Sequence, residues 1–272
     1  MSRTTSSDRK SFDHITVPAG VRAAAAPRHI DQILQSFNTW AFKRAQPSDS
    51  RLLGKVVKGA VLRQEPISFV LYWGKGPRST VGAYEAQCLD FLSAMANRVA
   101  AVYDKGAAFN LVLTDTHALL NGHSPSDVTR YFAEVAQTAG TYGFASYLLG
   151  DLCSAAGGDV AVPTDCAPSE KTLDQLARSA MRWYRGAGTP EEGARTYYRM
   201  NMFEREVVEH FFPASVFVTF NGHEHRELFP VQLPIFYMYS LKRGTSVKPW
   251  FLPDPADASN TDSDIELMKC GT

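Results

Sequence analysis

Residues 67–114 constrain the fold more than any other part of the sequence, because two apolar runs flank one amphipathic segment. The run at 67–73 is almost entirely apolar, and the run at 107–114 is apolar on both faces, as expected for a central strand. Between them, residues 83–103 place apolar side chains at helical spacing, which predicts a helix with one buried face. A strand, a helix and a second strand of these lengths are typical of parallel neighbouring strands in an α/β fold.

The same alternation continues over residues 28–252, which we expect to form a single α/β catalytic domain. Further helices are predicted at 30–45 and directly after Ser124, Ser169 and Thr189, and further strands at 145–149, 216–220 and 235–239. The Asn221-Gly222 pair after the strand at 216–220 is typical of a hairpin turn. The sequence therefore predicts a Rossmann-like three-layer α/β domain, in which a mostly parallel sheet has a mixed antiparallel edge.

The two ends of the chain have a different composition from the rest. Residues 1–27 are rich in serine, arginine and alanine, and residues 253–272 are acidic with small polar side chains. Such segments bury little apolar surface, so we expect a flexible leader and a disordered acidic tail.

Charge and hydropathy narrow the class of protein. Lys plus Arg and Asp plus Glu both number 28, and this balance argues against a nucleic-acid-binding protein that works by bulk electrostatics. No apolar run approaches the roughly 20 residues that span a bilayer, and the N-terminus lacks the apolar core of a signal peptide. We therefore expect a cytoplasmic protein with small-molecule substrates and with neither nucleic-acid nor membrane partners. The four cysteines are far apart and form no CxxC pair, so a cysteine zinc site or a disulfide framework is not expected.

Reactive side chains follow the strand at 67–73. Trp73 ends that strand, and Lys75 and Arg78 lie in the glycine-containing turn before the next helix, where two cations and a helix N-terminus favour an anion. The alternative is a surface turn with solvated charges. Glu85 stands in the first turn of the helix, either as a partner of the helix dipole or as a group that orients the lysine or a substrate ammonium.

Asp115 and His117 leave the strand at 107–114 at its carboxyl end, where α/β enzymes bind ligands. An aspartate and a histidine two residues apart offer a base with its orienting partner, or two metal ligands. The alternative is an Asx-turn with a histidine packed under the following loop.

Two further groups are weaker candidates for substrate binding. His223 and His225 follow the Asn-Gly turn, and one of them could reach the cleft, although no third metal ligand is identifiable by spacing. Arg195 and Arg199 lie on one face of a predicted helix, where they face either an acidic side chain or a phosphate.

A longer pattern carries a resemblance to a known family. It comprises the lysine turn, Gly82-Ala83-Tyr84-Glu85 before the helix, Tyr103-Asp104-Lys105-Gly106-Ala107 before the strand, Thr114-Asp115 after it, and Asp127-Val128-Thr129-Arg130-Tyr131. Over residues 66–135 the chain resembles the isonitrile (isocyanide) synthase family, also known as the pyoverdine/dityrosine biosynthesis proteins. Thr116 and His117 stand where the family usually has a glycine after the aspartate.

The resemblance implies an enzyme of natural-product biosynthesis that converts the amino group of an amino acid to an isonitrile. It implies that the added carbon comes from ribulose 5-phosphate, that no metal or redox cofactor takes part, and that a tailoring oxygenase acts downstream. It assigns catalysis to Lys75, Glu85 and Asp115, to which the residues themselves add His117, and it places Tyr84 at the substrate.

Two alternative functions remain open from the sequence. One is a metal-dependent, non-haem iron oxygenase that uses His117, His223 and His225. The other is a non-catalytic protein of the same fold that binds an amino acid or a sugar phosphate.

Overall fold

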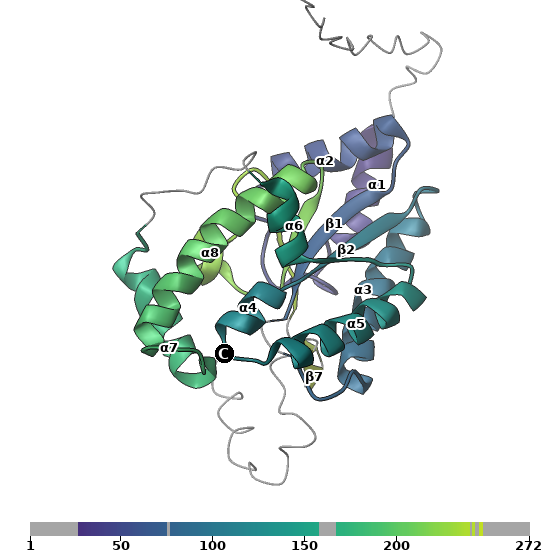
Figure 1. Ribbon diagram of the computed structural model, residues 1–272. Helices are drawn as coiled ribbons and strands as arrows, with labels where there is room; N and C mark the ends of the chain where they lie inside the picture. The colour runs from purple at the N-terminus through teal and green to yellow at the C-terminus, as the bar shows by residue number, and fades with distance from the viewer. Residues whose placement is uncertain (1–26, 75–76, 158–166, 240, 243–244, 247–272) are drawn as a thin grey trace, which may run out of the picture.

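A five-stranded sheet lies at the centre of the protein in the computed structural model (Figure 1), which describes residues 27–74, 77–157, 167–239, 241–242 and 245–246. The strands of this sheet are β1 (Ile67–Trp73), β2 (Ala107–Leu113), β3 (Ala145–Leu148), β4 (Val216–Thr219) and β5 (Ile235–Tyr237), in the order β3-β2-β1-β4-β5. Every pair of neighbours is parallel, and β1 pairs with β2 over its whole length, from Ile67–Ala107 to Trp73–Leu113. The predicted α/β fold and the pairing of the strands on either side of residues 83–103 are confirmed.

The helices are α1 (Pro27–Phe37), α2 (Ser50–Arg63), α3 (Ala83–Ala100), α4 (Asp115–Leu120), α5 (Pro125–Thr141), α6 (Leu149–Ala156), α7 (Glu170–Trp183), α8 (Pro190–Phe211) and the 3₁₀ helix η2 (His223–Leu228). A separate antiparallel pair is formed by β6 (Leu241–Lys242) and β7 (Thr245–Ser246). No helix in these described ranges is long and apolar enough to cross a membrane.

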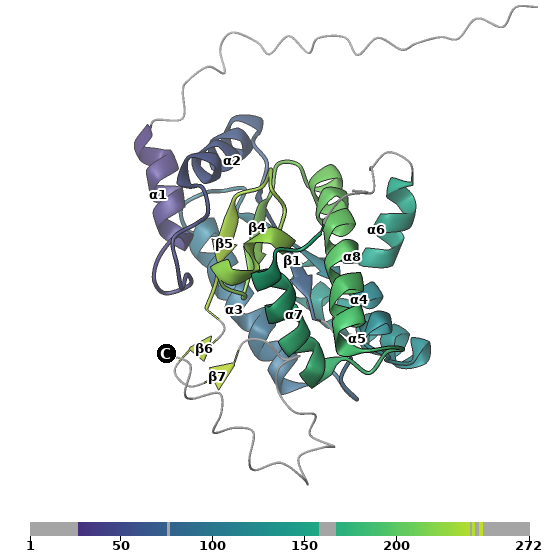
Figure 2. The ribbon, with the colours of Figure 1, turned by 90° about the vertical axis from the view of Figure 1, so that its left-hand side faces the viewer.

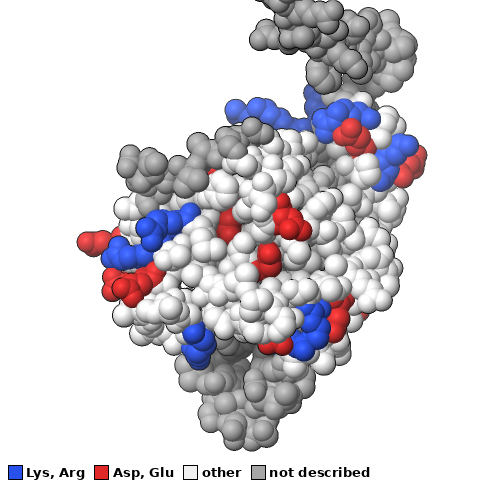
Figure 3. All heavy atoms as spheres, in the orientation of Figure 1, with Lys and Arg blue, Asp and Glu red and all other residues white. Residues whose placement is uncertain are grey.

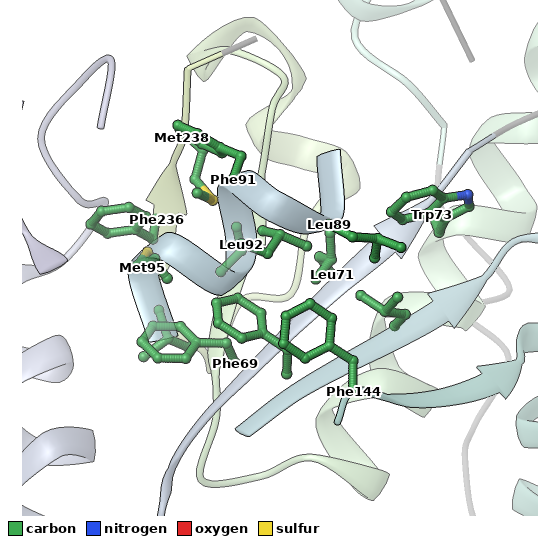
Figure 4. Close-up of a cluster of buried hydrophobic side chains, with 14 of the residues drawn as sticks. Phe69, Leu71, Trp73, Leu89, Phe91, Leu92, Met95, Phe144, Phe236 and Met238 are labelled. Carbon is green, nitrogen blue, oxygen red and sulfur yellow. The ribbon is translucent and has the colours of Figure 1, made fainter. Parts of the chain in front are cut away.

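Helices cover both faces of the sheet, as Figures 1 and 2 show. Successive side chains of a strand point to opposite faces, so Phe69, Leu71 and Trp73 of β1 join the core under α1, α2, α3 and α5. Val70 belongs to the second core, which β1 shares with α6, α7 and α8. Figure 4 shows the first of these cores, with the apolar face of α3 packed on β1.

The predicted hairpin at Asn221-Gly222 is wrong. β4 and β5 are parallel, and η2 follows Gly222 in place of a returning strand. The Glu224 carboxylate accepts a hydrogen bond from the backbone N–H of Gly222 (3.1 Å), which turns the chain into the 3₁₀ helix. All residues of β4 and β5 are buried, as parallel strands covered on both faces require. The expected mixed antiparallel edge is therefore not confirmed, since the five described strands of this sheet are all parallel.

The segment at 42–48 protects the outer edge of β5. Arg44 N–H donates to the Tyr237 carbonyl (2.9 Å), and Ser48 N–H donates to that of Ile235 (3.0 Å). Lys43 and Met238 form an isolated antiparallel bridge. The helix predicted to reach residue 45 ends at Phe37 because this segment serves the hydrogen-bonding groups of an otherwise open sheet edge.

Helix starts were predicted well where a side chain caps the backbone. Ser124 accepts a hydrogen bond from Asp127 N–H and precedes Pro125 at the start of α5. Thr189 and Glu192 form a reciprocal capping box at the start of α8, which begins directly after Thr189 as predicted. The predicted tail lies outside the described residues, as does the predicted leader except for Pro27.

Candidate active site

The strand order creates a crevice between β1 and β4. From β1 the chain moves outward through β2 and β3, and it then returns to place β4 on the other side of β1. Loops after two such strands diverge, so ligands bind beyond the carboxyl ends of the strands at this point in open α/β sheets. A cleft with about 600 Å³ of empty space, including the part open to solvent, lies there. Its polar lining comes from Tyr72, Thr114, His117, Tyr197, Asn201, Thr219, Asn221 and His225.

His117 lines one wall of this cleft, and the buried Glu204 lies behind it. His117 Nε2 lies 2.6 Å from Glu204 Oε2, and both residues are at most 2% exposed. The other carboxylate oxygen of Glu204 accepts a hydrogen bond from the Thr116 hydroxyl at 2.8 Å. With an ionised Glu204, Nε2–H of a neutral His117 donates to the carboxylate, and Nδ1 then carries the lone pair. A histidine held in one tautomer is suited to accept a proton.

α8 brings three polar groups to this wall. Tyr197, Asn201 and Glu204 are spaced by four and three residues, so they lie on one face of the helix. The ring of Tyr197 meets His117 edge-on at a centroid distance of 4.9 Å. Asn201 Nδ2 donates to the Tyr197 carbonyl (2.7 Å), which fixes the orientation of its side-chain amide.

Tyr72 contributes a hydroxyl group that no other described residue satisfies. Its ring contacts His117 and Phe217 edge-on, and its Oη is buried with no hydrogen-bond partner among the residues that the structure describes. Burial, and after it the negative charge of Glu204, raises the pKa of Tyr72 well above its ordinary value. The phenol therefore remains protonated near neutral pH, and it can donate a hydrogen bond to a ligand in the cleft.

A second polar cluster lies on the opposite face of the sheet. Arg78 Nε is 3.3 Å from Glu85 Oε1, and their side chains are 5% and 1% exposed. Glu85 also accepts hydrogen bonds from the Gly82 backbone (2.9 Å) and from the Tyr131 hydroxyl (3.1 Å). Burial and the charge of Glu85 raise the pKa of Tyr131, which keeps this phenol a donor. Tyr84, 40% exposed, lies 5.2 Å beneath the Arg78 guanidinium.

The structure separates Asp115 from His117. The two residues were expected to act together from a turn, but they belong to α4, where residues two apart point to different sides. Asp115 Oδ1 accepts a hydrogen bond from Gly150 N–H (2.9 Å), and a Cβ at position 150 would lie only 2.7 Å from its Oδ2. Glu204 therefore occupies the place beside His117 that the sequence suggested for Asp115.

The remaining predicted residues lie in several places. Lys75 lies outside the described residues, although Gly74 before it lines the cleft with a φ of +67°. Trp73 is fully buried in the core under α3 (Figure 4). Arg195 and Arg199 are exposed, and Arg195 pairs with Glu191 at 2.9 Å. Neither arginine lines the cleft.

The two histidines of η2 differ in position. His223 is exposed and stacks on Tyr237 at a centroid distance of 4.0 Å, whereas His225 lines the cleft. Among the described residues, no three His, Cys, Asp or Glu side chains are grouped so that they could hold a metal ion. The three histidines considered for an iron site are therefore not brought together.

Several residues at or beside the cleft were not identified from the sequence. Glu204 and Asn201 belong to a helix that was recognised, and a polar stripe at 197, 201 and 204 would have marked them. Tyr72 resembled any aromatic residue of a buried strand. Cys153 lies near the histidine–glutamate pair, and burial, then the charges of Glu204 and Asp115, raise its pKa to about 12.

Comparison with known proteins bears on the fold. The chain superposes on the PvcA protein from Pseudomonas aeruginosa with a TM-score of 0.63 and 15% sequence identity, over 82% of this chain and 87% of that one. The chain has the PvcA fold. Tyrosyl-tRNA synthetase from Pyrococcus horikoshii, solved with L-tyrosine, matches with a TM-score of 0.39 and 9% identity, over 81% of this chain and 58% of that one. No protein-family model and no curated protein matches the chain.

Proposed function

We propose that this protein is an isonitrile synthase-like enzyme that converts the amino group of an amino acid to an isonitrile with ribulose 5-phosphate as carbon donor. Two likenesses support this proposal. Residues 66–135 resemble the isonitrile synthase family, also known as the pyoverdine/dityrosine biosynthesis proteins, and the PvcA protein has the same fold over most of both chains. We further propose that it acts in the cytoplasm, in natural-product biosynthesis, with a tailoring oxygenase consuming its product.

The observation that carries the proposal is the buried His117–Glu204 pair in the cleft at the carboxyl ends of β1 and β4. Joining an amine to a ketose requires a carbinolamine and an imine, followed by proton removals and carbon–carbon cleavage. These steps need a base of fixed orientation, a hydrogen-bond donor for a sugar oxygen and a site largely shielded from water. His117 and Tyr72 supply the first two requirements, and the aromatic side chains of the cleft favour the third.

We assign a separate role to each group. His117 Nδ1 accepts and returns protons, Glu204 keeps the ring in that tautomer, and the Tyr72 hydroxyl donates to a substrate oxygen. Asn201, Asn221 and His225 offer further polar contacts for the hydroxyl and phosphate groups of the sugar. In this scheme the cleft binds the pentulose phosphate.

The residues implied by the resemblance receive roles that fit their positions. Lys75, which follows Gly74 in the sequence, is proposed to anchor the phosphate or to activate the ketone. Glu85 is proposed as a positioning residue, since its carboxylate orients the Arg78 cation and holds the start of α3. Asp115 is proposed as a second positioning residue, since its carboxylate accepts a hydrogen bond from Gly150 N–H and so links the start of α4 to the start of α6.

The test is product formation by purified protein incubated with single amino acids and ribulose 5-phosphate, with isonitriles detected by mass spectrometry after trapping with a tetrazine. The wild-type protein should give an isonitrile with at least one amino acid. His117→Ala should lower turnover by at least a hundredfold, and Lys75→Ala should abolish it.

The fold must survive in both variants, as judged by soluble yield and melting temperature. Tyr142→Phe is the control, because the Tyr142 hydroxyl donates a hydrogen bond to the exposed Asp90 and does not line the cleft. Full activity in Lys75→Ala would remove that turn from the site. Absence of an isonitrile with every amino acid tested would contradict the proposed function.

A further inference from the structure

A second cavity lies on the other side of α4 from His117. It is enclosed by the ends of β2 and β3 and by α4, α5 and α6, and it is called the β3 pocket below. Its empty space is about 1020 Å³, including the part open to solvent, which exceeds that of the first cleft. A cavity of this size accommodates a small organic molecule.

The walls of the β3 pocket are mainly apolar. Phe132, Ala133 and Ala136 of α5 form one side, and Leu148 and Leu152 form another. Such walls favour a ligand with a hydrocarbon or aromatic portion, because burying apolar surface away from water is favourable.

The charged side chains of the β3 pocket are all acidic. Asp115 and Asp151 line it, and its described lining includes no lysine, arginine or histidine. Figure 3 shows the same asymmetry at the surface: acidic atoms lie over α4 and α6 in the middle of this face, and the nearest basic atoms lie toward its margins. Carboxylates without a neighbouring cation attract a positively charged ligand and repel an anion.

The β3 pocket also contains a hydroxyl group without a described hydrogen-bond partner. Ser146 Oγ is buried and makes no hydrogen bond within the described part of the chain. An unpaired buried hydroxyl is unfavourable, and a ligand that donates or accepts a hydrogen bond there would relieve this loss. The hydroxyl and the two carboxylates therefore surround a space that is otherwise apolar.

We propose that the β3 pocket binds an organic ammonium ion with an apolar side chain, held by Asp151 and the Oδ2 atom of Asp115. Oδ1 of Asp115 is already engaged by the Gly150 N–H group, which aligns the carboxylate. The apolar walls receive the side chain, and a compact ammonium group can donate three hydrogen bonds to the carboxylates and to Ser146. This pocket lies across α4 from the cleft that is proposed to hold the pentulose phosphate, so the inference goes beyond the proposed function and does not depend on it.

Binding can be tested without turnover, so that failure of this site and failure of the proposed reaction are distinguishable. The probes are 2-phenylethylamine, the neutral 2-phenylethanol and the anionic 3-phenylpropionate, each titrated calorimetrically into the full-length protein at neutral pH. We expect the amine to bind at least tenfold more tightly than the alcohol, and the acid to bind more weakly than either.

Three variants locate the binding. Asp151→Asn should weaken amine binding roughly tenfold, the loss of about one charge-assisted hydrogen bond, and should leave binding of the alcohol unchanged. Ala133→Phe should weaken binding of both, because Ala133 lies at the wall of the pocket and a phenyl ring there takes up part of the space. Asp174→Asn is the control, since Asp174 pairs with Arg178 on the exposed face of α7.

Two outcomes would overturn the inference. One is equal affinity for the amine and the alcohol. The other is amine binding that survives both Asp151→Asn and Ala133→Phe, which would place the amine elsewhere. Amine binding that both variants weaken supports the site whether or not the protein forms an isonitrile.

Discussion

Two buried polar clusters flank β1, one on each face of the sheet, and they differ in what they leave unpaired. In the cluster of Arg78, Glu85 and Tyr131, the carboxylate is surrounded by a guanidinium, a phenol and a backbone N–H group. In the cluster of His117, Glu204 and Tyr72, the carboxylate is equally well paired, but the phenol beside it has no described partner and faces a cleft.

This difference distinguishes a buried polar cluster that stabilises the fold from one that is available to bind a ligand. A buried charge needs partners, and a cluster in which the protein supplies all of them fixes local structure. A buried donor left unpaired beside a cleft is unfavourable in the free protein, and this loss is recovered when a ligand supplies an acceptor. The first cluster should therefore respond to mutation mainly in stability, and the second mainly in activity.

The largest effect is expected at Glu204. In Glu204→Gln the side chain keeps its size, but its amide can donate to His117 Nε2 and so favours the tautomer in which Nδ1 carries the proton. Turnover of the folded protein should fall roughly a thousandfold. The measurement is the steady-state rate per folded molecule. Glu206→Gln, which alters a half-exposed neighbour paired with Arg205, should stay near the wild-type rate.

The next effect tests the other cluster. Glu85→Gln leaves Arg78 without its buried counter-charge, which should lower the free energy of unfolding by about 3 kcal/mol. Urea denaturation measures this loss, and turnover per folded molecule should fall by less than tenfold. In the control Glu65→Gln, the exposed pair with Arg63 is removed and stability should change by less than about 1 kcal/mol. A small loss of stability in Glu85→Gln together with a large loss of turnover would mean that this cluster, too, serves activity.

A smaller effect is expected at Tyr72. Tyr72→Phe removes the unpaired hydroxyl and retains the ring contacts with His117 and Phe217. Turnover should fall about tenfold, the loss of one hydrogen bond to substrate, while stability should not decrease because no protein hydrogen bond is lost. In the matched variant Tyr131→Phe, the hydrogen bond to Glu85 disappears, so stability should fall instead. Equal stability losses in the two variants would contradict the distinction.

The sequence allowed local features to be predicted and left distant ones undetermined. The strands at 67–73 and 107–113 and the Ser124 and Thr189 caps depend on neighbours within about ten residues or on simple periodicity. The pairing of His117 with Glu204 joins residues 87 positions apart, and periodicity within each helix does not specify it.

Two mistakes had a common physical cause. Asp115 to His117 was interpreted as a turn, and Asn221-Gly222 as a hairpin, because both contain residues that favour turns. In each case a carboxylate stabilises a helical backbone conformation instead. Glu204 binds the side chains of Thr116 and His117 in α4, and Glu224 accepts a hydrogen bond from Gly222 N–H at the start of η2. Local propensity was thus overridden by hydrogen bonds that only the folded chain makes.

The smallest effect is predicted for a change at the start of α8. It tests whether the loss of turnover in Glu204→Gln comes from the missing carboxylate or from a destabilised helix. Thr189→Ala removes the N-cap of α8 and should lower the free energy of unfolding by about 1 kcal/mol. Because Glu204 lies about four helical turns away, turnover per folded molecule should stay at the wild-type level.

Glu192→Gln tests the same N-cap through the pH dependence of stability. Hydrogen bonds from the backbone and then the side chain of Thr189 lower the pKa of Glu192. The carboxylate therefore stabilises the fold above the pKa of the unfolded state, and this contribution is lost as the pH falls through the lower pKa of the folded state. Urea denaturation should show a stability difference between wild type and Glu192→Gln at pH 7 that shrinks in acid.

If Thr189→Ala lowered turnover as much as Glu204→Gln does, the loss at Glu204 would reflect a disturbed helix, and the functional assignment of the second cluster would fail.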